Sequence, residues 1–368
     1  MTKLAAIDIG NDSVKAIFGD GERFQIMNVV ATEQENREYV EMEEKPIDGL
    51  HVRVVSGSLK VGKGIYVVGP LAMKYDTNEE ITLDDNKYEN DQTIIMLLTS
   101  IAMNAVKEQK EDKQEVRYTL STGLPIKEIR KDARDAFKAK LLNSAHEVEF
   151  LDTPQYSGKK VIISFDDVIV LSEGMAAYTE IAFNPDGTTK NEDLTEGVVM
   201  IVDIGGRTTD IAVIENGKAV NPYSIGWTIG VSQYLDKIIQ EVENEFDYRF
   251  KSRRELVDVI AHQNPEHQGH IWVRGNRTDI NAIIQRYLSG LAAEEYKIIS
   301  ETWSKMPNAK RAYIIGGGAI ALKEYISDIN KRKRNYPFQY VEHNKSIWMI
   351  AESYFTILNL HLQRSKSA

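Results

Sequence analysis

Short apolar runs alternate along the chain with longer segments whose apolar positions recur at helical spacing. A short apolar run has the length of a buried strand, whereas apolar residues at every third or fourth position indicate an amphipathic helix. Alternation of the two predicts an α/β architecture. The predicted strands are residues 4–9, 14–18, 118–124, 161–165, 168–171, 198–202, 211–214 and 312–315, and the predicted helices are 92–109, 127–142, 174–183, 231–246, 254–261, 280–305 and 347–362.

One strand–turn–strand unit occurs twice. Asp8-Ile9-Gly10 ends the first apolar run, and the next run leads to the turn pair Asp20-Gly21. Asp203-Ile204-Gly205 ends a later run in the same way, and Asn216-Gly217 closes the hairpin that follows. Asp-Gly and Asn-Gly favour tight hairpin turns because these residues tolerate positive φ angles. The two copies align without gaps, so we predict the same supersecondary unit in each half of the chain.

Composition narrows the class of protein. The sequence has 368 residues, no cysteine and a formal net charge of −10. This length corresponds to about two domains. The lack of cysteine excludes a disulfide framework, a thiolate metal site and a cysteine nucleophile, and the acidic balance disfavours general nucleic-acid binding. The sequence shows neither a signal-peptide core nor the roughly 18 uninterrupted apolar residues of a membrane span, so we expect a cytoplasmic protein without a membrane partner.

Three glycine-rich turns, beginning at Gly10, Gly205 and Gly316, each follow a predicted strand. Glycine lets a backbone approach a ligand closely, and successive N–H groups in such turns form anion sites. Asp8 and Asp203 stand beside two of these turns, and bare carboxylates suit a phosphate site only if a cation such as Mg²⁺ lies between them. Any one of the turns alone fits a plain hairpin loop, but the repeated pattern favours a nucleotide site.

The order of these motifs resembles that of the ATPase superfamily of actin, heat-shock chaperones and sugar kinases. Residues 8–16 are similar to its first phosphate loop, residues 203–210 to its second and residues 314–319 to its adenosine loop. Leu171-Ser172-Glu173-Gly174 resembles the connecting segment, whose glutamate positions the attacking water. The motifs span most of the chain.

The resemblance implies an actin-like, ribonuclease H-like duplicated fold of two domains with a nucleotide cleft between the lobes. Domain I would comprise residues 1–182 and 345–368, with an exposed insertion at about 25–90, and domain II residues 183–344. The acidic segment 33–44 and the polar segment 76–91 are expected to be solvated loops or edges rather than sites.

The resemblance also implies the ligands and their residues. ATP, or alternatively GTP, would bind with Mg²⁺, and Glu173, Asp203 and Asp8 would be catalytic, with both aspartates holding the metal through water. Glu173 alone would also suit a plain first-turn helix acid. Arg207 departs from the small residue common in the superfamily, and its role is open. The implied nucleotide-binding residues are Gly10, Asn11, Asp12, Ser13, Lys15, Gly205, Gly206, Arg207, Thr208, Thr209, Gly316, Gly317, Gly318 and Ala319.

Within the superfamily the sequence resembles the ParM (StbA) plasmid-segregation actins, through Ser121-Thr122-Gly123-Leu124-Pro125, the short third glycine loop and residues 344–354. This family implies an ATP-dependent filament of the chain itself, in which hydrolysis destabilises the filament. A centromere-binding adaptor would be the partner, so that DNA is reached only indirectly. The alternatives are a non-polymerising small-molecule kinase, for which no general-base aspartate is apparent, and a membrane-associated scaffold, which usually carries a terminal anchor.

Three other segments have features of binding sites that their sequence context does not support. Residues 57–64 nearly match a P-loop, but Gly64 replaces the Mg²⁺-binding Ser or Thr and a strand follows, so we predict a hairpin. His262, His267 and His270 lie in a loop-like context that disfavours a metal site. Residues 331–334 are a basic run that we interpret as a solvated helix end, with a filament contact as the alternative.

Overall fold

The computed structural model describes residues 2–33, 45–75, 78–79, 86–109, 111–250 and 253–367. The chain forms two compact units, the first of Met1–Lys190 and Trp348–Ala368 and the second of Asn191–Ile347. The first boundary lies later than the predicted 182/183 because the chain folds back after helix α3 (Glu173–Ala182). There the Lys190 N–H donates to the Ala182 carbonyl over 2.8 Å, and Phe183 bridges to Thr189.

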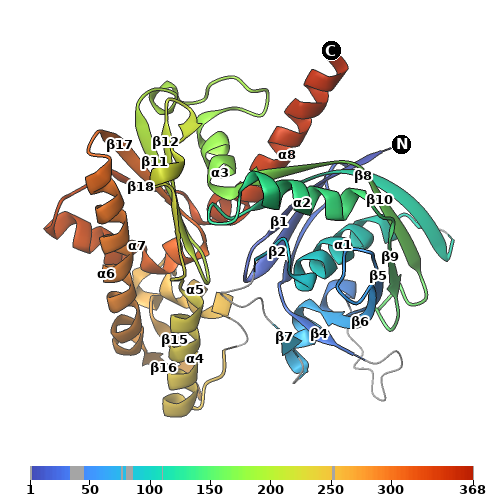
Figure 1. Cartoon of the computed structure of the whole chain (residues 1–368). Coiled ribbons are helices and arrows are strands. Elements are labelled where there is room, and N and C mark those ends of the chain that lie inside the picture. Colours follow the sequence, from blue (N-terminus) through green and yellow to red (C-terminus); the bar gives the residue numbers. More distant parts are fainter. Residues whose placement is uncertain are drawn as a thin grey trace. The chain divides into compact units, whose positions relative to one another are not determined.

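The first unit is built on a ten-stranded sheet in the order β3-β2-β1-β8-β10-β9-β5-β6-β4-β7 (Figure 1). Helix α1 is buried from Gln92 to Val106 and packs on β1 and β10, and α2 also packs on β10. The strands are β1 (Lys3–Ile9), β2 (Ser13–Phe18), β3 (Arg23–Met27), β4 (Val30–Thr32), β5 (Leu50–Val55), β6 (Lys63–Val68), β7 (Asn78–Glu79), β8 (Lys113–Leu124), β9 (His146–Phe150) and β10 (Lys160–Ser172). The other helices are η1 (Pro46–Asp48), η2 (Gly69–Lys74), α1 (Asp91–Val106), α2 (Lys131–Leu142) and α3, joined by α8 (His343–Ser367) from Trp348 onward.

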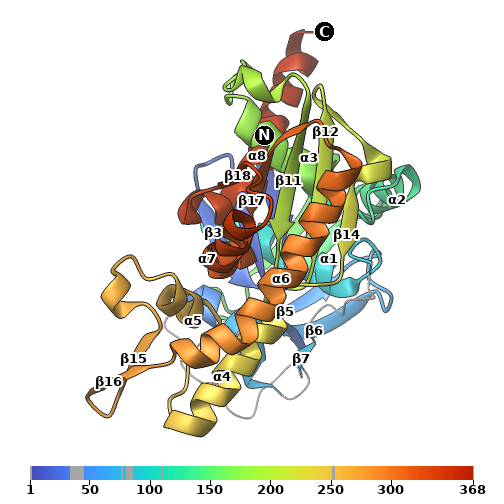
Figure 2. The ribbon, with the colours of Figure 1, turned by 90° about the vertical axis from the view of Figure 1, so that its left-hand side faces the viewer.

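The second unit has a smaller sheet in the order β13-β12-β11-β17-β18, with β14 added beside β12. The long helix α6 runs beside α4 and α7 and crosses in front of the strands in Figure 2. The strands are β11 (Val198–Ile204), β12 (Thr209–Glu215), β13 (Lys218–Ala219), β14 (Ile225–Trp227), β15 (His270–Val273), β16 (Asn276–Asp279), β17 (Ala309–Ile315) and β18 (Phe338–Tyr340). The helices are η3 (Glu192–Leu194), η4 (Asn221–Tyr223), α4 (Ser232–Phe246), α5 (Arg253–Ile260), η5 (Pro265–His267), α6 (Asn281–Lys305) and α7 (Gly317–Arg332).

The duplicated hairpin predicted from the sequence is confirmed. β1 pairs antiparallel with β2 and parallel with β8, and β11 pairs antiparallel with β12 and parallel with β17. Gly21 has a φ of +88°, and Asn216 and Gly217 have φ angles of +50° and +76°. These are the left-handed conformations that the turn pairs predict. The α/β class is therefore present in both units.

Two local predictions are wrong. Residues 161–165 and 168–171 belong to one strand, β10, because a register shift between Phe165 and Asp167 absorbs one residue without ending the pairing with β8. The segment 76–91 contributes an edge strand, since β7 is the last strand in the sheet order and pairs with β4, but the predicted solvation fails at Lys87, which is buried with 5% of its surface exposed. A buried lysine needs a charged partner, which no local pattern could reveal. The acidic segment lies outside the described residues from position 34 onward.

The three sites set aside from the sequence have ordinary local structures. Residues 57–64 connect the antiparallel strands β5 and β6, which confirms the predicted hairpin. The described residues contain no group of three or more His, Asp or Glu side chains arranged to hold a metal. Helix α7 ends at Arg332, and residues 331–334 are exposed.

Among the described helices, none has both the length and the apolar character needed to cross a bilayer.

Candidate functional site

The predicted first phosphate loop is the turn between β1 and β2. The pairing of the two strands sets Asp8 opposite Lys15, and Lys15 Nζ lies 3.5 Å from Asp8 Oδ2. Both side chains are largely buried, with 9% of Asp8 and 15% of Lys15 exposed. A Cβ at Gly10 would lie 2.8 Å from the Ser13 carbonyl oxygen and 3.2 Å from Lys15 Nζ. Gly10 therefore has to be glycine, because the loop packs closely against the Lys15 ammonium group at this position.

A polar network that the motifs do not include supports this loop. Asn28 donates through Nδ2 to the Gly10 carbonyl over 2.8 Å, and its N–H donates to the Asp12 carbonyl. Gln92, at the start of α1, donates to the Asn28 carbonyl and side-chain oxygen. Asn28 and Gln92 are both buried. A glutamine in the first turn of a largely apolar helix is the sequence signal for this arrangement.

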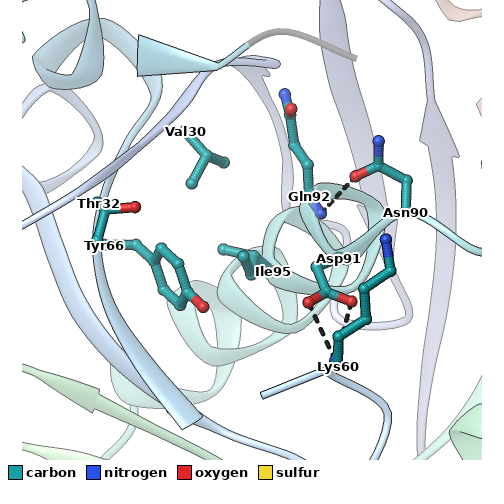
Figure 3. A pocket seen from close by; sticks show the side chains of 8 residues that line it. All are labelled: Val30, Thr32, Lys60, Tyr66, Asn90, Asp91, Gln92 and Ile95. Carbon is teal, nitrogen blue, oxygen red and sulfur yellow. Dashed lines mark hydrogen bonds between the residues drawn. The ribbon is translucent and has the colours of Figure 1, made fainter. Parts of the chain in front are cut away.

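The start of α1, including Gln92, also borders a pocket of about 320 Å³ (Figure 3). The Asn90 side chain caps α1 by accepting from the Gln92 N–H, and the Asp91 carboxylate accepts from the Lys60 N–H. Val30, Tyr66 and Ile95 form its apolar wall. The pocket contains none of the sequence-predicted site residues.

Glu173 is the first residue of α3 and follows the last residue of β10. Its Oε1 lies 2.7 Å from Lys87 Nζ, with 13% of the Glu173 side chain and 6% of the Lys87 side chain exposed. Burial raises the pKa of Glu173 and Asp8 raises it further, while Lys87 opposes both. Glu173 thus lies in the electrostatic field of Asp8 and Lys15, as well as in the first turn of a helix. The structure brings together the predicted residues of this unit and adds Lys87, which sequence reasoning missed.

The predicted second phosphate loop is the turn between β11 and β12. It closes through the Gly205 N–H, which donates to the Thr208 carbonyl over 2.8 Å. Its Gly205 and Gly206 carbonyls accept from the backbone N–H groups of Val231 and Ser232, at the start of α4. These bonds hold the loop against a helix N-terminus within the second unit.

The third glycine turn joins β17 to α7 and lies against the second loop. Because β17 is parallel to β11, Asp203 pairs with Ile315 and the carboxyl ends of both strands meet at one sheet edge. Gly316 has φ +92° and ψ 163°, and its N–H donates to Ser346 Oγ over 2.8 Å. A Cβ at Gly318 would lie 2.9 Å from the Ile204 carbonyl oxygen. The second unit therefore places Asp203 and both of its glycine turns together, at the sheet edge where ligands of α/β proteins bind.

We expect Gly316→Ala to lower the free energy of unfolding by about 2 kcal/mol, since its backbone region is open essentially to glycine alone. A Cβ would also lie 2.3 Å from Asp203 Oδ1 and 2.4 Å from the Ile204 carbonyl oxygen. Thermal unfolding of the purified protein measures the change. Gly317→Ala is the matched control, because nothing lies within 4 Å of its Cβ position. Equal melting temperatures for the two variants would contradict the crowding at Gly316.

The predicted nucleotide-binding residues differ in accessibility. Thr209 is fully buried, and its hydroxyl donates to Glu295 Oε1 on α6 over 2.8 Å. This side chain faces the core of the unit, so the hydroxyl of Thr209 is engaged within the protein and the nucleotide-binding role of this residue stays a prediction for its backbone. Ala319 is likewise buried in α7, where it supports the turn by packing. Gly10, Asn11, Lys15, Gly205, Gly206, Arg207, Thr208 and Gly316 are partly exposed, Asp12 and Gly317 are exposed, and Ser13 and Gly318 are buried.

Taken separately, each unit offers groups that suit a nucleotide phosphate or its cation. Asp8 and Asp203 offer the hard oxygen ligands that Mg²⁺ prefers. Gly10 and Gly316 stand where a Cβ would collide with neighbouring atoms of the same unit, so only glycine allows the close packing of these two turns. Each unit by itself therefore carries a carboxylate next to a glycine turn, a combination that suits a cation or a phosphate group.

Together the duplicated hairpins and their glycine turns define the actin-like fold. Residues 6–175 match the family model of the N-terminal domain of actin-like proteins, and residues 198–346 match that of the Alp7A C-terminal domain. The chain belongs to the actin-like proteins, as its motifs indicate.

Solved structures of actin-like proteins match almost the whole chain. Bacillus thuringiensis ParM with ATP is 25% identical with a TM-score of 0.74, covering 98% of this chain and 99% of that one. The actin-like protein Alp7A is 21% identical with a TM-score of 0.81, covering 100% and 98%. A 15-stranded ParM filament from Clostridium botulinum is 17% identical with a TM-score of 0.68, covering 98% and 99%. At these two lower identities the likeness shows the fold. No protein of curated function matches the chain in sequence.

Proposed function

We propose that this protein is an actin-like ATPase that polymerises with ATP and segregates plasmid DNA, with hydrolysis destabilising the filament. The observation that carries the proposal is the largely covered Glu173 side chain, which starts α3 in the field of Asp8 and Lys15 beside the predicted first phosphate loop. The ParM structure with ATP, which matches 98% of this chain, supports ATP as the nucleotide. The ParM filament from Clostridium botulinum supports self-assembly as the mode of action.

Each predicted residue then has a chemical task. Asp8 and Asp203 would hold Mg²⁺, which offsets negative charge on the phosphate oxygens. Lys15 and the loop backbones would stabilise the charge that develops on the γ-phosphate. The Glu173 carboxylate would orient a water molecule, whose oxygen bonds to the γ-phosphorus as the bond to the ADP oxygen breaks. The electron pair of that bond leaves with ADP, and the proton of the water passes to the carboxylate and then to solvent.

Head-to-tail contacts between identical subunits generate an open filament, which fits a role in moving cargo. The formal net charge of −10 disfavours direct DNA binding by the chain as a whole. We therefore propose that a centromere-binding adaptor connects the filament to DNA.

Right-angle light scattering and phosphate release, followed in one sample after addition of Mg²⁺-ATP, test this function. A concentration series should show scattering that rises above a critical protein concentration and decays as phosphate appears. Phosphate release without scattering at any concentration would overturn the filament and favour the small-molecule kinase. Absence of both signals would contradict the nucleotide site itself.

A further inference from the structure

We propose that Lys87 is a positioning residue of the hydrolysis reaction, which holds the Glu173 carboxylate in place for the attacking water. The inference rests on the proposed function of Glu173 and adds a residue that neither the motifs nor the family match assigns. Lys87 lies 86 positions before Glu173 in the chain, and its Nζ approaches Glu173 Oε1 to 2.7 Å. The contact is thus a tertiary feature of the first unit.

Two hydrogen bonds hold the backbone around Lys87 in place. Its N–H donates to Glu128 Oε2 over 2.8 Å, just before α2 begins. The carbonyl of the next residue, Tyr88, accepts from Lys140 Nζ near the end of α2, also over 2.8 Å. A lysine side chain ordinarily loses much rotamer freedom on being fixed. Here the two hydrogen bonds fix the backbone of the turn that carries Lys87, so only the side chain itself has to be ordered for the ammonium to contact Glu173.

The ion pair with Lys87 leaves the Glu173 carboxylate able to bind the attacking water. The ammonium engages Oε1 and leaves Oε2 to accept a hydrogen bond from water. The charges around the pair are Asp8 on β1, Lys15 on β2 and Glu128 before α2. Burial lowers the pKa of Lys87, but the negative charges of Glu173, Asp8 and Glu128 together raise it, so Lys87 carries its charge. That charge favours the ionised form of Glu173, which is the form that accepts a proton.

Kinetics of four proteins test the proposal: the wild type, Lys87→Met, Glu173→Gln and the double variant. We expect Lys87→Met to lower kcat for phosphate release about 10-fold or more while KM for ATP changes less than about 3-fold. Lys87→Met should have no further effect in the Glu173→Gln background, because a positioning residue acts only through its partner. Lys87→Arg, which keeps the positive charge, should recover most of the lost kcat.

Two further measurements separate positioning from a merely structural role. Lys87→Met leaves a buried carboxylate without its cation and lowers stability, so the melting temperature of each variant is recorded. Should Lys87→Met not fold, the double variant, which lacks both charges of the ion pair, is compared with Glu173→Gln; equal kcat values support a role of Lys87 through Glu173, and a lower kcat of the double variant overturns it. Lys107→Met is the matched control, since Lys107 pairs with Glu22 at the surface.

The outcomes distinguish this inference from the proposed function. An unchanged or raised kcat for a folded Lys87→Met, or an equal loss in the Glu173→Gln background, would overturn the role of Lys87 while leaving the ATPase intact. Full activity of Glu173→Gln would instead overturn the role of Glu173 on which the inference rests. A loss that Lys87→Arg does not recover would also count against positioning by charge.

Discussion

Replacing Glu173 with glutamine should lower the rate of phosphate release roughly 100-fold or more while filament assembly persists. Lys87 Nζ contacts Oε1 of the glutamate, and an amide at this position would turn its oxygen toward the ammonium. Its NH₂ group would then replace Oε2, and an amide nitrogen cannot accept a hydrogen bond from water. The filament should therefore form with ATP and fail to decay, which combined light scattering and phosphate release measure directly.

The effect of Glu173→Gln must be separated from a general loss of charge on α3. Glu180→Gln makes the same chemical change on the same helix, about two turns further along. We expect Glu180→Gln to release phosphate at nearly the wild-type rate. Wild-type decay of Glu173→Gln filaments would contradict the assignment of Glu173 to the water.

The parts of the site that the sequence predicts are local ones. The hairpins around Gly10 and Gly205 follow from apolar runs that end in Asp-Ile-Gly and from turn pairs with positive φ. Such signals lie within about 20 neighbouring residues, where periodicity and turn chemistry determine the conformation. The α/β class and the related architecture of the two units could be predicted for the same reason.

The parts that the sequence does not predict depend on tertiary contacts. Lys87 lies in a polar segment whose composition predicts a solvated loop, and its contact with Glu173 forms only in the folded protein. Thr209 differs from Lys87, because it shares one face of β12 with the buried Ile211 and Val213. Strand alternation places residues two apart on one face, so its side chain was already directed toward the core.

Glu295 is expected to make the stability of the second unit depend on pH. It is fully buried on α6, and one of its oxygens accepts from Thr209 while Oε2 has no hydrogen-bond partner. Burial raises its pKa to about 7, the Thr209 hydroxyl opposes this rise, and Glu294 adds to it. The ordinary value is near 4.5, so the folded protein binds this proton more tightly than the unfolded chain does.

The difference between the folded and unfolded pKa of Glu295 determines how stability changes with pH. A group with a raised pKa in the folded state contributes stability that is complete below its unfolded pKa and is lost as pH rises through its folded value. The contribution should therefore fall from about pH 5 to about pH 8, by on the order of 3 kcal/mol in total. Glu295→Gln removes the titration, so we expect the variant to gain stability relative to wild type over this interval.

Urea unfolding followed by tryptophan fluorescence at pH 5.5, 7 and 8.5 measures the effect. Trp227, Trp272 and Trp303 lie in the second unit and report on it. Glu294→Gln is the matched control, because Glu294 is the exposed neighbour of Glu295 on the same helix, and its stability relative to wild type should stay nearly constant with pH. A constant difference for Glu295→Gln would mean that the carboxylate keeps its charge inside the core. The Thr209 hydroxyl would then have to stabilise a buried anion unaided, and the base of the second phosphate loop would not respond to pH.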